Sequence, residues 1–148
     1  MRLPLVGALI GALLLVAPAL AEDKVPTALF QEILIKASLL TLNDANITGN
    51  YTVLHAKLAK PFREQFNPDR LKQVFKPFAD KKLDLGPIAA KPPIATADTK
   101  IDNRGALVLR GYFDTSPSRV YYEFDFAPSE NEWKPIKLNV SVKPPGEG

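Results

Sequence analysis

Three consecutive segments in the C-terminal part of the chain alternate apolar and polar residues with a period of two. They run from 106 to 113, from 119 to 127 and from 133 to 142, and short polar turns separate them. Successive side chains of a β-strand point to opposite faces, so each segment predicts a strand with one buried face. The pattern therefore predicts an antiparallel sheet that is apolar on one side and more polar on the other.

The alternation also assigns residues to the two faces of this sheet. On the buried face we expect Leu107, Leu109, Gly111, Phe113, Val120, Tyr122, Phe124, Phe126, Ile136, Leu138, Val140 and Val142. On the opposite face we expect Arg110, Tyr112, Tyr121, Glu123, Asp125, Lys137, Asn139 and Ser141. Two weaker strand patterns precede them, at 83–88 and 94–101.

The region before these strands has helical periodicity. A helix is predicted from Pro26, a residue suited to a first turn, to Leu42, and its wide apolar surface predicts that it is largely buried. The segment 43–50 is rich in residues that end helices and form turns. A second helix is predicted from 51 to 58, with an N-cap at 48 or 50.

A third helix is predicted from 67 to 78. Asn67 is a favourable N-cap, Pro68 fits the first helical position, and Asp69 suits the positive end of the helix dipole. The apolar residues that follow at helical spacing are Leu71, Val74, Phe75 and Phe78. Pro77 is expected to end this helix. Three helices followed by a run of strands predict the α+β class.

The N-terminus has the features of a cleavable secretory signal peptide. Arg2 supplies a positive charge, and residues 5–16 are apolar and uncharged. Ala19 and Ala21 supply the small side chains that a signal peptidase recognises, so cleavage is expected before Glu22. The predicted domains are a signal peptide at 1–21, one α+β domain at 22–143 and a loose tail at 144–148.

The alternative for the N-terminus is a membrane anchor. The uncharged run 3–21 is nearly long enough to span a bilayer, which needs about 20 apolar residues. Pro4 and Pro18 disfavour a continuous helix there. We therefore expect a periplasmic or secreted protein with no membrane span after cleavage, and the lack of cysteine excludes a lipoprotein.

Composition bears on the cellular compartment and on the classes of partner that we expect. The chain contains no cysteine, whereas small secreted eukaryotic domains often depend on disulfides, and this favours a bacterial periplasm. Sequons at Asn46, Asn50 and Asn139 would matter only in a eukaryotic secretory pathway. The net charge is +3, or +2 without Arg2, and the lysines are scattered, so no nucleic-acid partner is expected.

The order of these elements resembles the nuclear-transport-factor-2-like, ketosteroid-isomerase-like superfamily, in its exported bacterial branch. The resemblance covers nearly the whole mature chain and rests on the helix ending at 42–46, the segment 49–54, the helix 67–78 and the strands ending at 133–138. It implies a curved sheet that wraps around the helices as a cone. It does not transfer a function, because this fold hosts both enzymes and binding modules.

Four residues are candidates for a catalytic site inside the cone. His55 is the only histidine, and imidazole titrates near neutral pH. Dehydratases of the superfamily pair a histidine with an aspartate, which would require Asp114 or Asp125 beside His55. Isomerases use a carboxylic base with a tyrosine, but Tyr122 shares its face with Phe124 and is more simply a core aromatic. The simpler interpretation of His55 is a half-buried side chain bonded to the backbone.

No metal or cofactor is expected. One histidine and no cysteine leave only oxygen ligands, and the spacing of a calcium loop is absent. The phosphate-binding loop and the dinucleotide glycine pattern are absent as well.

The polar face of the sheet carries the candidates for an interface. Arg110, Tyr112, Tyr121 and Glu123 lie there, and tyrosine and arginine are enriched at interfaces. The alternative is an ordinary solvated surface. Members of the superfamily often dimerise through the sheet.

The sequence thus favours a non-catalytic, exported binding or assembly domain. The partners we expect are a second copy of the chain, through the sheet face, and a small apolar ligand or a peptide in the cone. The alternative is a small isomerase or lyase that uses His55 and a strand carboxylate.

Overall fold

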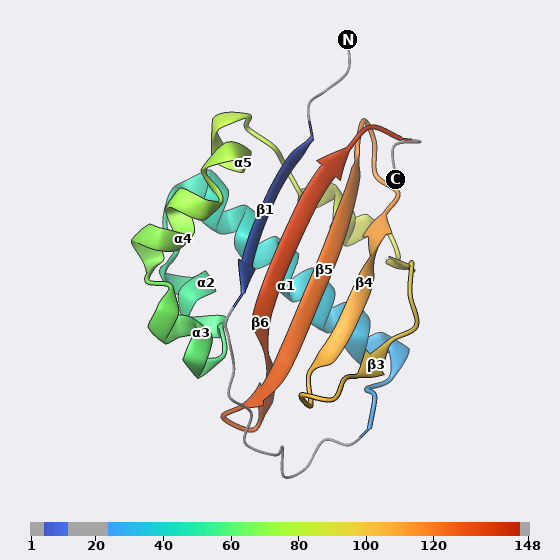
Figure 1. The fold of residues 1–148 in the computed structure, drawn as a ribbon. Coiled ribbons are helices and arrows are strands. Elements are labelled where there is room, and N and C mark those ends of the chain that lie inside the picture. The colour runs from blue at the N-terminus through green and yellow to red at the C-terminus, as the bar shows by residue number, and fades with distance from the viewer. Residues whose placement is uncertain (1–4, 12–23, 146–148) are drawn as a thin grey trace.

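The computed structural model describes residues 5–11 and 24–145 (Figure 1). Within these ranges a series of helices is followed by a curved antiparallel sheet that does not close on itself. The predicted fold class is therefore confirmed. The predicted cleavage site between 21 and 22, and the last three residues of the predicted tail, lie outside the described residues.

Helix α1 (Ala28–Thr48) crosses one face of the sheet. It continues past the predicted end at Leu42, because Asn43 and Asn46 are buried in tertiary contacts that offset their low helix propensity. The helix ends where Gly49 adopts a left-handed conformation and its N–H donates to the carbonyl of Ala45 at 2.8 Å. Its first turns are more exposed than predicted, since Leu29 lies largely in solvent.

The predicted second helix is present as α2 (Thr52–Lys57), and a further short helix, α3 (Lys60–Gln65), follows it. Tyr51 is the N-cap of α2, and neither predicted cap holds that position. Asn50 instead accepts a hydrogen bond from the N–H of Thr52 at 3.1 Å.

The predicted third helix is divided into α4 (Pro68–Val74) and α5 (Lys76–Asp80). Its start is as predicted, because the Asn67 side chain caps it by accepting from the N–H of Arg70 at 2.8 Å. The break falls at Phe75, two residues before the proline that was expected to end the helix. A continuous helix would drive the ring of Pro77 into the carbonyl four residues earlier.

The sheet has six strands among the described residues, all paired in antiparallel fashion. They are β1 (Val6–Gly11), β2 (Ile94–Ala95), β3 (Lys100–Ile101), β4 (Leu107–Phe113), β5 (Arg119–Ser129) and β6 (Glu132–Lys143). The spatial order is β1-β6-β5-β4-β2, and β3 also pairs with β4. The three strong strand predictions are confirmed.

The two weak strand predictions were less accurate. Residues 83–88 form no strand, and the 3₁₀ helix η1 (Gly86–Ala90) begins there instead. Pro87 lacks the N–H that a central strand needs, whereas it suits the first turn of a helix. The segment 94–101 is interrupted, and only its two ends pair with β4.

The inner face of β4, β5 and β6 faces the helices and forms the core, as the alternation predicted. The rings of Phe113, Tyr122, Phe124 and Phe126 line it in sequence, with neighbouring centroids 5.5 to 6.2 Å apart. Val142, at the end of β6, is only half-buried.

Strand β1 was not predicted, because its residues lie in the apolar run of the predicted signal peptide. It adds to the free edge of β6, beside α4 and α5 (Figure 1). Val6 and Ile10 enter the core, whereas Leu5 and Leu9 remain largely exposed. Among the described residues, no helix has the length and hydropathy needed to cross a membrane.

Candidate functional site

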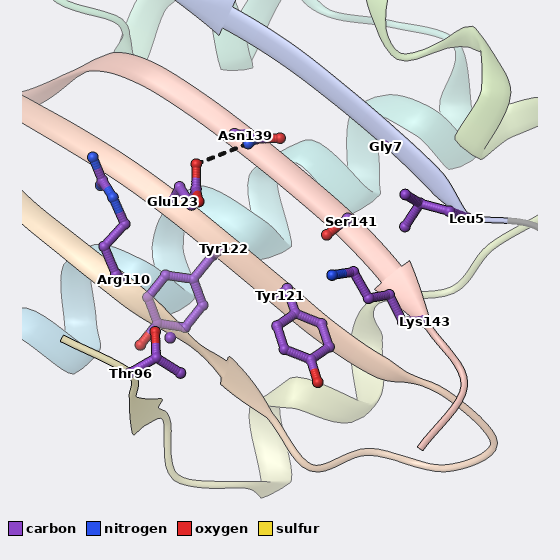
Figure 2. Close-up of a pocket in the computed structure, with 11 residues that line it drawn as sticks. Leu5, Gly7, Thr96, Arg110, Tyr121, Tyr122, Glu123, Asn139, Ser141 and Lys143 are labelled. Carbon is purple, nitrogen blue, oxygen red and sulfur yellow. Dashed lines mark hydrogen bonds between the residues drawn. The ribbon is translucent and has the colours of Figure 1, made fainter. Parts of the chain in front are cut away.

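The outer face of the sheet, away from the helices, carries a depression of about 310 Å³ (Figure 2). β4, β5 and β6 supply most of its lining, and Leu5 and Gly7, which precede the predicted cleavage point, form one side that processing would remove. Its polar and aromatic side chains include Arg110, Tyr121, Glu123, Asn139, Ser141 and Lys143. Three of the four predicted interface residues thus line one hollow, and the fourth, Tyr112, lies beside it.

Two tyrosines stack on this face. Tyr112 and Tyr121 are register partners on β4 and β5, and their ring centroids lie 5.3 Å apart. The guanidinium of Arg119 lies 4.9 Å from the centroid of Tyr112, and the Nζ of Lys143 lies 4.7 Å from that of Tyr121. Cations at this distance are attracted to the ring faces. The four side chains therefore form an ordered row, which we call the tyrosine row.

Glu123 supplies an acidic group beside this row. Its side chain is 49% exposed, and it accepts a hydrogen bond from Asn139 at 3.0 Å (Figure 2). The Nζ of Lys137 lies 3.7 Å away from it. One carboxylate edge thus stays accessible to a partner, while the amide of Asn139 holds its orientation.

Asp125 lies on the outer face, as predicted, but its side chain is only 5% exposed. Arg110 donates to one carboxylate oxygen at 2.7 Å, and Arg104 donates to the other at 3.0 Å. The register between β5 and β6 shifts after this residue, because β6 carries one extra residue, Ile136, between the partners of Asp125 and Phe126. Both carboxylate oxygens therefore accept hydrogen bonds from arginine, which leaves Asp125 poorly suited to act as a base.

Arg104 also binds Asp102, which closes the turn before β4. Burial would raise the pKa of Asp102, but hydrogen bonds from Arg104 and from the N–H of Ala106 outweigh it and hold that pKa below its usual value. The cluster of Asp102, Arg104, Arg110 and Asp125 consequently joins the turn to β5 by charge-assisted hydrogen bonds.

His55 lies on α2 with its Nε2 3.0 Å from the carbonyl oxygen of Arg63. The structure does not bring it to either predicted aspartate. Asp114 is exposed and accepts from Arg119 at 2.9 Å, and Asp125 is held by its two arginines. The candidate histidine–aspartate pair is thus not assembled.

Tyr122 points into the core, as its place in the alternation predicted. It is almost fully buried between Phe113 and Phe124, and burial raises its pKa to about 12. Its ring lies over Gly111, the register partner on β4.

Two buried amides on α1, Asn43 and Asn46, were not predicted as structural residues from the sequence. Asn43 accepts from the N–H of Leu85 at 2.9 Å and donates to Asp84 at 3.1 Å. Asn46 accepts from the hydroxyl of Tyr51, whose pKa is raised by burial. These amides fasten α1 to the following chain, and a glycan on Asn46 would be incompatible with its burial.

Among residues 5–11 and 24–145, no three His, Asp or Glu side chains are grouped so that they could hold a metal ion. No family model, no curated protein and no solved structure matches this chain.

Proposed function

We propose that this protein is an exported, non-catalytic assembly domain that associates with a second copy of itself through the outer face of the sheet. The observation that carries the proposal is the tyrosine row beside Glu123. It presents ordered aromatic rings, two cations and an accessible carboxylate on one surface.

The charges on this surface favour a second copy as the partner. A two-fold axis brings the same surface of both subunits together, so the surface must be complementary to itself. Glu123 and Lys143 lie on neighbouring strands of this face with opposite charges. A two-fold arrangement can pair Glu123 of one copy with Lys143 of the other, twice in each dimer.

Export is inferred from the sequence of the N-terminus, with Arg2, the apolar run and the small residues before Glu22.

The order of helices and sheet supports placing the chain in the nuclear-transport-factor-2-like superfamily, as the sequence resemblance implies. The isomerase or lyase alternative has less support, because His55 contacts a backbone carbonyl instead of a carboxylate.

The proposed dimer can be tested by reversing the charge at Glu123 and at Lys143. The protein, purified from the periplasm of a bacterial host, is examined by native mass spectrometry and sedimentation. We expect a dimer for the unaltered chain and weaker dimers for Glu123→Lys and for Lys143→Glu. An equimolar mixture of the two variants should restore a heterodimer, because each position 123 then again faces a charge of opposite sign at position 143.

Matched controls are Glu64→Lys and Lys81→Glu, which reverse exposed charges on the helical side and should leave the dimer unchanged. A monomer for the unaltered chain at micromolar concentration would refute the dimer. Weakening by both single variants without recovery in the mixture would refute the proposed pairing.

A further inference from the structure

Strand β1 covers an edge of the sheet that the predicted processing would expose. It pairs with β6 over six residues, from Val6 opposite Val142 to Gly11 opposite Lys137. All of these β1 residues precede the predicted cleavage point before Glu22. Removal of the leader therefore frees the backbone N–H and C=O groups along this edge of β6, which are a template for another strand.

Removal of β1 also exposes an apolar trough. Val6 and Ile10 are 5% and 2% exposed, and β1 packs against α4 and α5 as well as β6. Ala8, between them on the same face, is half-buried. Burial of aliphatic side chains is favourable, so a trough left empty and open to water is unfavourable.

We propose that in the exported protein this edge of β6 binds an extended peptide segment of a partner protein, which adds a strand in the place of β1. The proposal rests on the proposed export, because only processing removes β1. The contacts of β1 define the chemistry of the segment. It has aliphatic residues four positions apart, a small residue midway between them, and unrestricted residues at the outward positions where Leu5 and Leu9 stand.

A second copy of the chain fits this edge less well than a lone strand. The inward side chains of β1 lie between β6 and the helices α4 and α5. A β6 strand from a second copy would arrive with its own helices on the same side of the sheet, in the space that α4 and α5 occupy. A peptide brings no such layer, and its main chain supplies the hydrogen bonds.

The geometry of Gly7 supplies a register-specific test. An ideal Cβ on Gly7 would lie 3.5 Å from the Cβ of Ser141, its register partner. That separation lies within the range of a disulfide. The chain has no cysteine, so a single introduced thiol is unique.

The full chain carrying Ser141→Cys is exported by a bacterial host and purified from the periplasm, and its intact mass is measured. The processed protein is then mixed, in a glutathione redox buffer, with a synthetic peptide of residues 5–11 that carries Gly7→Cys and a solubilising lysine tail. We expect a start at Glu22 and a mixed disulfide between protein and peptide. Circular dichroism of the processed protein verifies that it is folded.

Matched peptides separate inward from outward contacts. A peptide with Val6→Asp and Ile10→Asp should cross-link at least about tenfold less, because two buried aliphatic contacts are lost. A peptide with Leu5→Asp and Leu9→Asp should cross-link about as well as the parent. A protein with Glu132→Cys, on the same strand but beyond the β1 stretch, should give little product with any peptide.

The outcomes distinguish the two proposals. A folded protein that starts at Glu22 but cross-links all peptides equally would overturn the peptide site and leave export intact. An unprocessed chain would overturn export and the peptide site together. A disulfide between two copies through the thiols introduced at position 141, formed in preference to the peptide, would assign the edge to a second copy and overturn the peptide as its occupant.

Discussion

The ring of Tyr122 lies over Gly111, its register partner on the neighbouring strand, and occupies the space that a β-carbon at Gly111 would need. The carbonyl of Ile94 closes the same space from β2. Gly111 is therefore a close-approach glycine, and the pair fixes how β2, β4 and β5 meet.

Gly111→Ala is expected to destabilise the protein by about 1–3 kcal/mol, because the new methyl group overlaps both the Tyr122 hydroxyl and a backbone carbonyl. Urea unfolding followed by circular dichroism measures the change. Val108→Ala, an outward change on the same strand, serves as the control and should cost less than about 1 kcal/mol. An unchanged unfolding midpoint for Gly111→Ala would show that the neighbouring strands can shift to admit the methyl group at no cost in stability.

Tyr122 makes stability fall at alkaline pH. Its pKa is raised from 10.0 to about 12 by burial. Above pH 10 the unfolded chain loses this proton before the folded chain does, so the free energy of unfolding falls as pH rises from about 10 to 12. Tyr122→Phe should reduce this loss, as measured by urea unfolding at pH 8, 10 and 11, whereas the outer-face variant Tyr112→Phe should retain it.

Asp125→Ala should destabilise the protein by about 3 kcal/mol, because it leaves Arg104 and Arg110 close together without their shared carboxylate. Thermal and urea unfolding measure the loss. Asp114→Ala removes an exposed ion pair with Arg119 and should cost less than about 1 kcal/mol. Equal effects of the two substitutions would contradict a structural role for the buried cluster.

His55 is expected to stabilise the fold through the hydrogen bond between its Nε2 and the carbonyl of Arg63. His55→Ala should cost about 1 kcal/mol, the usual value of one hydrogen bond. His55→Gln retains a donor and should recover part of that loss in the same unfolding assay. If His55→Gln lowers the free energy of unfolding as much as His55→Ala does, the hydrogen bond to Arg63 is not what makes the imidazole stabilising.

Much of the fold follows from local patterns in the chain. The period of two in 106–142 predicted the buried faces of β4, β5 and β6, and Asn67 predicted the start of α4. Both depend on neighbours within a few residues, since side-chain alternation and capping are properties of the backbone geometry itself. Tyr122 was predicted as a core aromatic for the same reason.

The candidate site depended on contacts that no local pattern contains. Asp125 was predicted on the outer face, but its buried carboxylate is held by Arg104 and Arg110, 21 and 15 residues away along the chain. Likewise, the hydrogen bond of Asn43 to Leu85 spans 42 residues, and it supports a helix that local propensity would have ended. Residue types at such separations could pair in many ways, and packing selects among them.

The pairing of β1 with β6 is the clearest case of this limit. The composition of the N-terminus specifies an apolar, uncharged segment, which suits a signal peptide and equally a buried strand. Only the folded chain shows that Val6 meets Val142, because the free edge of β6 and the apolar sides of α4 and α5 converge there. The apolar character of a segment is a property of its own residues. The surface against which its side chains pack forms only when segments far apart in the chain come together.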